Sequence, residues 1–545
     1  MAQALFSNPI IYADYSDPDA IRVGDDYFMT ASSFCNAPGL PILHSKDLVH
    51  WRLANYALPA VPGGRYANPA HGCGVWAPSI RFHDGLFYIY FPMPDEGIFV
   101  VTARDPLGQW SQPRLVRAGA GWIDPCPFWD DDGRAYLVAG VAKSRIGYKS
   151  VLLMAELSAD GMRLLGSERR VFDGNACAQP TIEGPKLYKR NGWYYIFAPA
   201  GGVKTGWQTV LRSRGIFGEY EHRIVMRQGG TSVNGPHQGA WIQTQTGQDW
   251  FLHFQDVYAA GRVVHLQPMR WQDDWPVIGK PVAGQDWGEP VSECAMPDVG
   301  QLPADYDAAQ WRVPASDDCD GGALSLQWQW NANPQPGWHA MTGSGIRLNA
   351  VPVSPLRPLA DYRNLLLQKW PAPQFTCVTV MDISTLAEGD MAGIVSLGTL
   401  YYGLAVSRSG DLLHVRQIRG GQDFDCERAF SEQSMEEFLL PFTIKSASCR
   451  SVRFFYAVER AGFSDREELD GTVRSAPRER VTLALGTDGT RWSYDFSVTD
   501  VTAGRWVGVK HGVFCAHDRS VHAEVQDAGH VILRSVEYRS GEERL

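Results

Sequence analysis

One phrase occurs five times in the first half of this chain: a polar turn followed by an aromatic and apolar run, at intervals of 48 to 60 residues. The copies are Gly24-Asp-Asp-Tyr-Phe-Met, Asp84-Gly-Leu-Phe-Tyr-Ile, Asp132-Gly-Arg-Ala-Tyr-Leu, Asn191-Gly-Trp-Tyr-Tyr-Ile and Gly247-Gln-Asp-Trp-Phe-Leu. Gly with Asp or Asn supplies the positive φ that a tight hairpin turn needs, and the apolar run suits a buried strand. A period of about 50 residues with several short strands per unit is typical of a β-propeller, so we predict five blades.

The residues that precede these turns point to a site. Seven to ten residues before each turn the sequence has Asp17, Trp76, Asp124, Glu183 and His237, each at the start of the strand that leads into the hairpin. Four of them have a Pro one or two residues later, which marks the entrance to a strand. The innermost strands of a propeller line its central channel, so equivalent positions in five blades converge. We therefore predict that two Asp, one Glu, one His and one Trp meet there.

Three carboxylates that face each other are costly for stability, because like charges in a poorly solvated cleft repel and at least one group must keep its proton at neutral pH. Any one of them could be a strand-edge residue that caps a turn, but three at equivalent positions of separate repeats favour a functional site. Glycoside hydrolysis needs one protonated carboxyl to donate to the leaving oxygen and one ionised carboxylate to activate water or attack the sugar. A third carboxylate can set the proton affinity of the acid.

Short motifs occur in a fixed order between residue 8 and about residue 280. They are Asn8-Pro, Ser16-Asp-Pro-Asp-Ala, His44-Ser-Lys-Asp-Leu-Val-His-Trp, Val75-Trp-Ala-Pro-Ser-Ile, Ile123-Asp-Pro, Ile182-Glu-Gly-Pro, Gly235-Pro-His-Gln-Gly-Ala and Gly261-Arg-Val-Val-His-Leu-Gln-Pro-Met. Together they resemble glycoside hydrolase family 43. The resemblance implies a five-bladed propeller and inverting cleavage, exo-acting or endo-acting, of xylosyl and arabinosyl linkages in plant cell-wall polysaccharides.

The resemblance also implies roles for single residues. Asp17 matches the general base that activates water, Glu183 matches the general acid, and Asp124 matches the third carboxylate, which tunes the pKa of the acid and holds it in place. Arg262 matches an arginine that binds a sugar hydroxyl near the base, and its guanidinium would also hold nearby carboxylates ionised. The implied direct displacement needs carboxyl groups about 6.5 to 9.5 Å apart.

Three further residues are expected to contact the sugar. Phe34 and Trp76 have flat apolar faces that suit sugar rings. His237 matches a histidine under the sugar ring that in some family members anchors a calcium ion, with water in the other positions. Calcium prefers oxygen ligands, so the expectation of calcium at His237 comes from the resemblance and not from the residue itself.

The second half of the chain has a different pattern. After Gly279 the sequence is rich in Pro and has few long apolar runs, which indicates a surface linker over residues 286–322. Alternating patterns return in Leu324-Ser-Leu-Gln-Trp-Gln-Trp, Thr376-Cys-Val-Thr-Val-Met, Gly393-Ile-Val-Ser-Leu and Val481-Thr-Leu-Ala-Leu. We therefore expect an all-β protein with a propeller over residues 1–285 and a β-sandwich over 323–545. In the family this sandwich is concanavalin-like, and a loop from it closes one end of the pocket, which favours exo-action.

Composition limits the partners and the compartment. A net charge of -10 and a pI near 5.8 argue against nucleic acid or anionic membranes, while a neutral oligosaccharide substrate needs no charge steering. No apolar stretch approaches the length of a membrane span. The 10 Cys include no Cys-x-x-Cys pair, and most lie in apolar contexts that favour buried thiols over disulfides. The start Met1-Ala-Gln-Ala-Leu fits a cytoplasmic chain, or a periplasmic or secreted one whose signal peptide has been removed.

The sequence therefore predicts an exo-acting β-xylosidase with α-L-arabinofuranosidase activity, acting on fragments of xylan or on arabinose-decorated xyloglucan. The reverse preference for arabinose, and a propeller that binds carbohydrate without catalysis, stay open as alternatives. Fructan and sucrose hydrolases also join a five-bladed propeller to a β-sandwich, and Arg104-Asp-Pro superficially resembles one of their motifs. Their opening motif, with Asn before Asp-Pro, is replaced here by Ser16-Asp-Pro.

Overall fold

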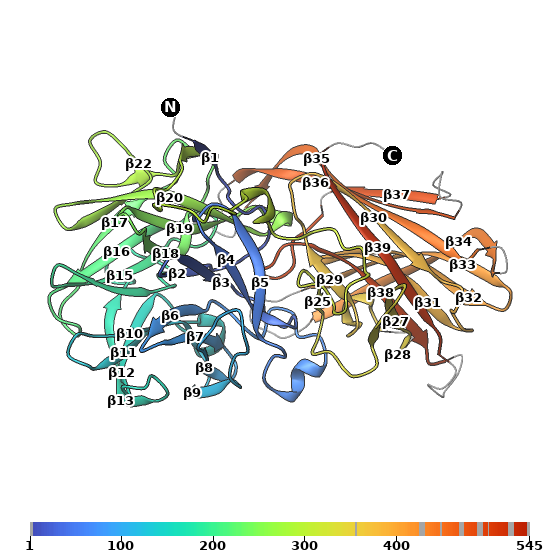
Figure 1. Ribbon diagram of the computed structural model, residues 1–545, viewed down its shortest axis with the longest axis horizontal. Helices are drawn as coiled ribbons and strands as arrows, with labels where there is room; N and C mark the ends of the chain where they lie inside the picture. Colours follow the sequence, from blue (N-terminus) through green and yellow to red (C-terminus); the bar gives the residue numbers. More distant parts are fainter. Residues whose placement is uncertain are drawn as a thin grey trace.

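Two all-β domains lie side by side, with the N-terminus on the first and the C-terminus on the second (Figure 1). The computed structural model describes residues 4–354, 357–423, 431–446, 449–467, 473–487, 494–499, 501–520 and 528–541. Helices are few and short: α1 (Lys143–Ile146), η1 (Gly64–Ala67), η2 (Tyr258–Ala260), η3 (Ala308–Gln310) and η4 (Leu359–Asp361). Among the described residues, none of the helices has the length and apolar character needed to cross a bilayer.

The first domain is the predicted five-bladed propeller, and each blade is a four-stranded antiparallel sheet in chain order. Blades 1 and 2 consist of β2 (Asp19–Val23), β3 (Asp26–Thr30), β4 (Gly39–Ser45), β5 (Trp51–Leu58), β6 (Ser79–His83), β7 (Leu86–Met93), β8 (Gly97–Ala103) and β9 (Arg114–Ala118). Blade 3 consists of β10 (Trp122–Trp129), β11 (Ala135–Val141), β12 (Val151–Leu157) and β13 (Leu164–Asp173). Blades 4 and 5 consist of β14 (Lys186–Arg190), β15 (Trp193–Ala200), β16 (Trp207–Ser213), β17 (Glu221–Met226), β18 (His237–Gln243), β19 (Asp249–Asp256), β20 (Arg262–Gln272) and β21 (Trp275–Ile278).

All five repeated turns join the first strand of a blade to the second, as predicted. Asp84 and Asn191 have φ of 47° and 51°, and the glycine that follows each has φ of 75° and 71°. Two successive residues with positive φ are the backbone signature of a tight turn whose twist matches that of the flanking strands. The apolar runs after the turns are buried, and Tyr90, Tyr136 and Tyr195 are among the largest fully buried side chains.

The segment after blade 5 returns to the propeller. The strands β22 (Lys280–Pro281) and β23 (Gly288–Glu289) extend blade 4, where β23 pairs with β17 in parallel. Next, β24 (Glu293–Ala295) pairs with β1 (Leu5–Ser7) near the N-terminus. The first part of the predicted linker is thus hydrogen-bonded to the propeller.

The second domain is a sandwich of two large antiparallel sheets. One sheet has the order β25 (Gln329–Trp330), β29 (Leu366–Lys369), β38 (Lys510–Asp518), β31 (Asp390–Leu397), β32 (Leu400–Ser409), β33 (Leu412–Asp423) and β34 (Ser431–Lys445), with β28 (Val351–Val353) beside β38. The other has the order β26 (His339–Thr342), β27 (Gly345–Asn349), β39 (His530–Ser540), β30 (Phe375–Asp382), β35 (Ser451–Glu467), β36 (Val473–Gly486) and β37 (Tyr494–Thr499).

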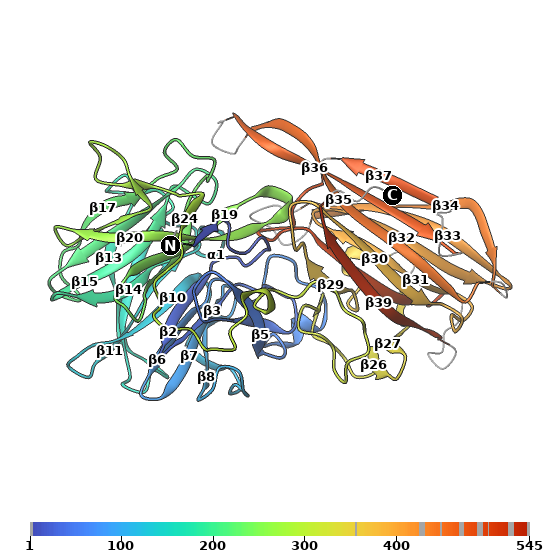
Figure 2. The same ribbon diagram turned by 45° about the horizontal axis from the view of Figure 1, so that its top comes forward.

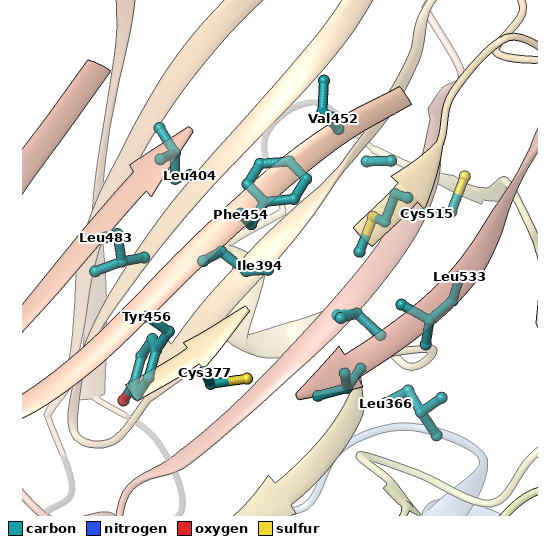
Figure 3. Packing of buried hydrophobic residues seen from close by; sticks show 14 of the residues in the cluster. Leu366, Cys377, Ile394, Leu404, Val452, Phe454, Tyr456, Leu483, Cys515 and Leu533 are labelled. Atoms are coloured by element: carbon teal, nitrogen blue, oxygen red, sulfur yellow. The ribbon is translucent and has the colours of Figure 1, made fainter. Parts of the chain in front are cut away.

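Apolar side chains from the two sheets form one core, shown in Figure 3 with Ile394 and Leu404 from one sheet and Phe454 and Leu483 from the other. The predicted strand at 324–330 is wrong for most of its length, because only Gln329 and Trp330 pair. Its alternation comes instead from a turn held by Trp328, whose Nε1 donates to Asp317 Oδ2 at 2.7 Å. All nine cysteines in the described part of the chain are free thiols, as expected.

Candidate active site

The five predicted site residues lie at the same end of the inner strands. Asp17, Trp76 and Glu183 lie just before β2, β6 and β14. Asp124 is the third residue of β10, and His237 is the first residue of β18. In a propeller these strand starts surround the mouth of the central channel. The charges of Asp17, Asp124 and Glu183 affect one another, which places the three carboxylates in one cluster.

The backbone explains how three carboxylates of different length converge. Asp17 and Asp124, each directly before a Pro, have φ of 55° and 56°, a conformation that few non-glycine residues adopt and that is often found at functional sites. In blade 4 the equivalent position is Gly184, with φ of 60°, and the acid is Glu183, one residue earlier. The longer Glu side chain compensates for its earlier position. A Cβ at Gly184 would lie only 2.8 Å from the side chain of Gln238, so this position has no room for one.

The candidate base, Asp17, is paired with a cation and a hydroxyl group. Arg262 Nη1 donates to both oxygens of Asp17, at 3.1 Å and 3.3 Å, and Ser32 Oγ donates to Asp17 Oδ2 at 2.6 Å. Asp17 and Arg262 are each 7% exposed, so these charge-assisted bonds lie away from bulk water. Ser32 was missed by the sequence analysis, because a lone Ser at a strand end carries no pattern.

The candidate acid is held in its protonated form. Burial, then the charges of Asp124 and Asp17, raise the pKa of Glu183 to about 8, although 26% of its side chain is exposed at the pocket opening. Burial and the charge of Asp17 also raise the pKa of Asp124 to about 7, while the Gly184 N–H donates to Asp124 Oδ2 at 2.8 Å. A carboxyl group that keeps its proton near neutral pH, close to a second carboxylate bound to an arginine, is the arrangement that acid–base chemistry requires.

His237 is fully buried, and neither of its ring nitrogens has a hydrogen-bond partner among the residues that the structure describes. Burial, helped by the nearby Arg262 charge, lowers the pKa of His237 to about 3, so the ring is neutral at neutral pH. Its Nε2 lies 3.6 Å from Glu183 Oε1. A buried polar atom without a partner is costly, and these two nitrogens therefore suit water, a substrate hydroxyl or a cation.

The aromatic side of the pocket combines residues from both domains. Phe34 is almost completely buried and Trp76 is half-buried, with ring centroids 6.5 Å apart. Trp506, on the loop before β38 of the sandwich, packs edge to face against Trp76 with centroids 4.7 Å apart. Arg145 covers the Trp76 ring at 5.2 Å. The sandwich thus supplies the predicted closing loop, but nothing in the sequence had singled out Trp506.

Asp14 fixes this loop against the pocket. Its Oδ1 accepts the backbone N–H of Arg262 at 3.0 Å, and its Oδ2 accepts the backbone N–H of Gly508 at 2.9 Å. The Val509 N–H also donates to the Ala259 carbonyl at 2.7 Å. One buried carboxylate therefore ties the strand that carries Arg262 to the loop that carries Trp506. Sequence analysis missed Asp14 because its partners lie 248 and 494 residues away.

A second charged group fills the channel below the carboxylates. Asp19 Oδ2 accepts from Arg81 Nη1 at 2.6 Å and from the Ile80 N–H at 2.8 Å, and Lys186 Nζ lies 3.8 Å from the same oxygen. Lys186 Nζ also donates to Ser79 Oγ at 2.6 Å and to the Pro78 carbonyl at 2.9 Å. Asp19 and Lys186 are fully buried. We call this buried cluster of Asp19, Arg81 and Lys186 the floor, because its residues follow the strand starts that carry the carboxylates.

A pocket with a carboxylate paired to an arginine, a second carboxyl group of raised pKa and an aromatic wall has the groups that define a glycoside hydrolase. Comparison with known proteins agrees. Residues 6–276 match the model of glycosyl hydrolases family 43, and residues 316–527 match the beta-xylosidase C-terminal concanavalin A-like domain. The rival motif Arg104-Asp105 lies in an exposed turn after β8, away from these residues.

Relatives span most of the chain. A Xylanibacter ruminicola protein provisionally named a beta-xylosidase is 41% identical over 82% of this chain and 80% of its own length. A non-reducing end alpha-L-arabinofuranosidase of Bacteroides ovatus is 32% identical over 72% of this chain and 74% of its own. The crystal structure of a xylan beta-1,4-xylosidase from Bacillus halodurans has the same fold, with a TM-score of 0.77 at 23% identity over 98% of this chain and 100% of that one. The chain belongs to glycoside hydrolase family 43.

Proposed function

We propose that this enzyme removes terminal β-D-xylosyl residues, and to a lesser extent α-L-arabinofuranosyl residues, from the non-reducing ends of plant cell-wall oligosaccharides, with inversion. The observation that carries the proposal is the different surroundings of two carboxyl groups in one pocket. Asp17 accepts hydrogen bonds from Arg262 and Ser32, whereas burial and the neighbouring carboxylates raise the pKa of Glu183 to about 8. The names of the relatives supply the two candidate sugars.

The proposed mechanism uses each group once. Asp17 takes a proton from water, which attacks the anomeric carbon, while Glu183 donates its proton to the departing oxygen. Arg262 then binds a sugar hydroxyl beside the base. Asp124 adds negative charge next to Glu183 and so keeps the pKa of the acid high. The floor and the Trp506 loop limit the pocket to one sugar at a chain end.

The pocket favours exo-action, and it favours an enzyme over a propeller that binds carbohydrate without catalysis. Trp506 and Trp76 close one side, so a long chain has no path through the site. A propeller that only bound carbohydrate would need Trp76 and Arg262, but it would not need a buried carboxyl group of raised pKa beside a carboxylate paired to an arginine. That pairing costs stability and is useful for proton transfer.

Calcium at His237 is a separate proposal. The two unpaired ring nitrogens and the neutral ring fit a ligand role. No cluster of three or more His, Cys, Asp or Glu that could hold a metal occurs among the described residues, so His237 would be the main protein ligand and water would complete the shell. Such an ion would add positive charge under the sugar ring. Calcium-dependent change in the melting temperature of the wild type, absent in His237→Ala, would support it.

The test of the proposed function is turnover of 4-nitrophenyl β-D-xylopyranoside and 4-nitrophenyl α-L-arabinofuranoside, with Asp17→Asn as control. We expect turnover of both, faster on the xyloside, and at least a 1,000-fold loss in the variant because no other group activates water. Proton NMR during xylobiose hydrolysis should detect α-xylose first. Faster turnover of the arabinofuranoside would reverse the ranking, and sugar binding without turnover would favour the non-catalytic propeller.

A further inference from the structure

A second cavity lies beside the active site, between the propeller and a hairpin of the sandwich. It has a volume of about 380 Å³ and is lined by Ser232, Asn234, Asp256 and Tyr258 from the propeller and by Arg460 and Phe463 from the sandwich. Pockets of about 300 to 1,000 Å³ that combine aromatic surface with a few polar groups are typical of small-molecule sites. The mechanism described above uses none of these six residues.

The cavity opens on the same face of the propeller as the carboxylates. Asp256 is the last residue of β19 and pairs with Arg262, whose guanidinium contacts Asp17. Phe254, two residues earlier on β19, pairs with His237. The loop with Ser232 and Asn234 leads from blade 4 into His237 and is held by Gln255, whose Nε2 donates to the Ser232 carbonyl at 3.0 Å and to Asn234 Oδ1 at 2.8 Å. The cavity is therefore on the rim next to the acid and Arg262.

The sandwich side of the cavity is built by a bulge. The strands β35 and β36 pair regularly up to Arg460 and resume at Phe463, which faces Pro477, so two residues of β35 are skipped. One of them is Gly462, with φ of 101°. A bulge bends a hairpin and increases its twist. Figure 2 shows β35 and β36 continuing past their sheet toward the propeller, and β36 contacts η2 there.

Phe463 is the large apolar residue that this hairpin leaves uncovered. Its side chain is 63% exposed, more than any other large apolar residue among those described. The Arg460 guanidinium lies 5.6 Å from the centre of the ring. An exposed aromatic ring beside a cation and opposite a carboxylate, Asp256, offers one flat apolar face and two hydrogen-bonding groups. A pyranose ring presents the matching surface, with C–H groups on its faces and hydroxyls at its edge.

We propose that this cavity binds the sugar units that follow the terminal residue of the substrate, with Phe463 as the stacking platform. This inference rests on the proposed function, because a closed pocket that takes a chain end leaves only the leaving-group side of the substrate outside. Glu183, which protonates that side, belongs to blade 4, and the 228–235 segment of the cavity wall connects blade 4 to blade 5. The sandwich thus determines how strongly the enzyme prefers longer oligosaccharides.

The test compares kcat/KM on xylotetraose with kcat/KM on 4-nitrophenyl β-D-xylopyranoside in the wild type, Phe463→Ala and Leu439→Ala. Leu439 is the matched control, because it is 61% exposed on β34 at the end of the sandwich far from the propeller (Figure 1). In Phe463→Ala we expect the ratio of the two values to fall about tenfold, which corresponds to about 1.4 kcal/mol, because the variant loses the stacking surface. In Leu439→Ala the ratio should equal that of the wild type.

Four results separate the possibilities. A ratio in Phe463→Ala equal to that of the wild type overturns the proposal, and so does an equal fall in both variants. A wild type that hydrolyses neither substrate overturns the proposed function instead. Thermal melting of the Phe463→Ala variant at the wild-type temperature, together with a lowered ratio, assigns the effect to binding and not to a disturbed hairpin.

Discussion

The centre of the propeller contains two groups of charged residues, one above the other. The upper group consists of Asp17, Asp124 and Glu183, and the floor consists of Asp19, Arg81 and Lys186. The floor has one carboxylate for two cations, and its charges are paired. The upper group has three carboxylates and a single contacting cation, Arg262, so two of the carboxyl groups have raised pKa values.

The comparison teaches how one channel serves two purposes. Paired charges near the start of the inner strands hold the blades together, because Asp19, Arg81 and Lys186 come from three different blades. The carboxyl groups of raised pKa at the mouth are unfavourable for folding, and perturbed carboxyl groups of this kind cluster at functional sites. Asp19 is thus paired with two cations, whereas burial and the charge of Asp17 raise the pKa of Asp124 to about 7.

The largest expected effect is on catalysis in the upper group. In Glu183→Gln, kcat on xylobiose should fall by about 1,000-fold or more, because the sugar leaving group needs a proton. The fall on 4-nitrophenyl β-D-xylopyranoside should be much smaller, because nitrophenolate leaves without one. Steady-state kinetics on both substrates measures the difference. Equal losses on the two substrates would show that Glu183 is not the general acid.

The next largest effect is on stability in the floor. Asp19→Ala leaves Arg81 and Lys186 buried without their carboxylate, and the free energy of unfolding should fall by about 3 to 5 kcal/mol. Urea denaturation measures it, with Asp84→Asn as the control because Asp84 is an exposed turn residue. A loss below about 1 kcal/mol would mean that the floor contributes little to holding the blades together.

Replacing a carboxyl group of the upper group should stabilise the fold at alkaline pH, whereas replacing Asp19 in the floor should destabilise it. A carboxyl group whose pKa rises from 4.5 to about 8 on folding favours the folded state at low pH, and this contribution is lost as pH rises from about 4.5 to about 8. Glu183→Gln removes that dependence. The difference in free energy of unfolding between variant and wild type should therefore shift in favour of the variant by about 1 to 2 kcal/mol from pH 5 to pH 8.5. Thermal melting at the two pH values tests this. A relative stability that is the same at both pH values would contradict the raised pKa.

The smallest expected effect is on the alkaline limb of the pH profile of kcat/KM. The negative charge of Asp124 helps to raise the pKa of Glu183, so Asp124→Asn should lower that pKa and move the alkaline limb of kcat/KM to lower pH, by about one unit. A pH profile of kcat/KM on the nitrophenyl xyloside measures this shift. A limb that stays near pH 8, or moves upward, would show that Asp124 does not tune the acid.

Much of the propeller and its site could be predicted because the relevant information is local. Each turn carries its own Gly, Asp or Asn, and each candidate residue stands a few positions before it. Pseudo-repetition then places Asp17, Asp124 and Glu183 together without knowledge of any long-range contact. The strand predicted at 324–330 was wrong because only local information was used. The alternation around Trp328 also fits a turn that is held by a side-chain hydrogen bond.

The sequence by itself determined five blades, the sandwich and the three converging carboxylates, because hairpin turns and strand patterns act over a few residues and repeat. Only the tertiary structure decided which residues complete the pocket. Asp14 binds Gly508 across 494 positions, Trp506 packs on Trp76, and Phe463 reaches the rim of blade 5 through a bulged hairpin. These contacts join residues that share no local pattern, so they exist only once the two domains have packed against each other.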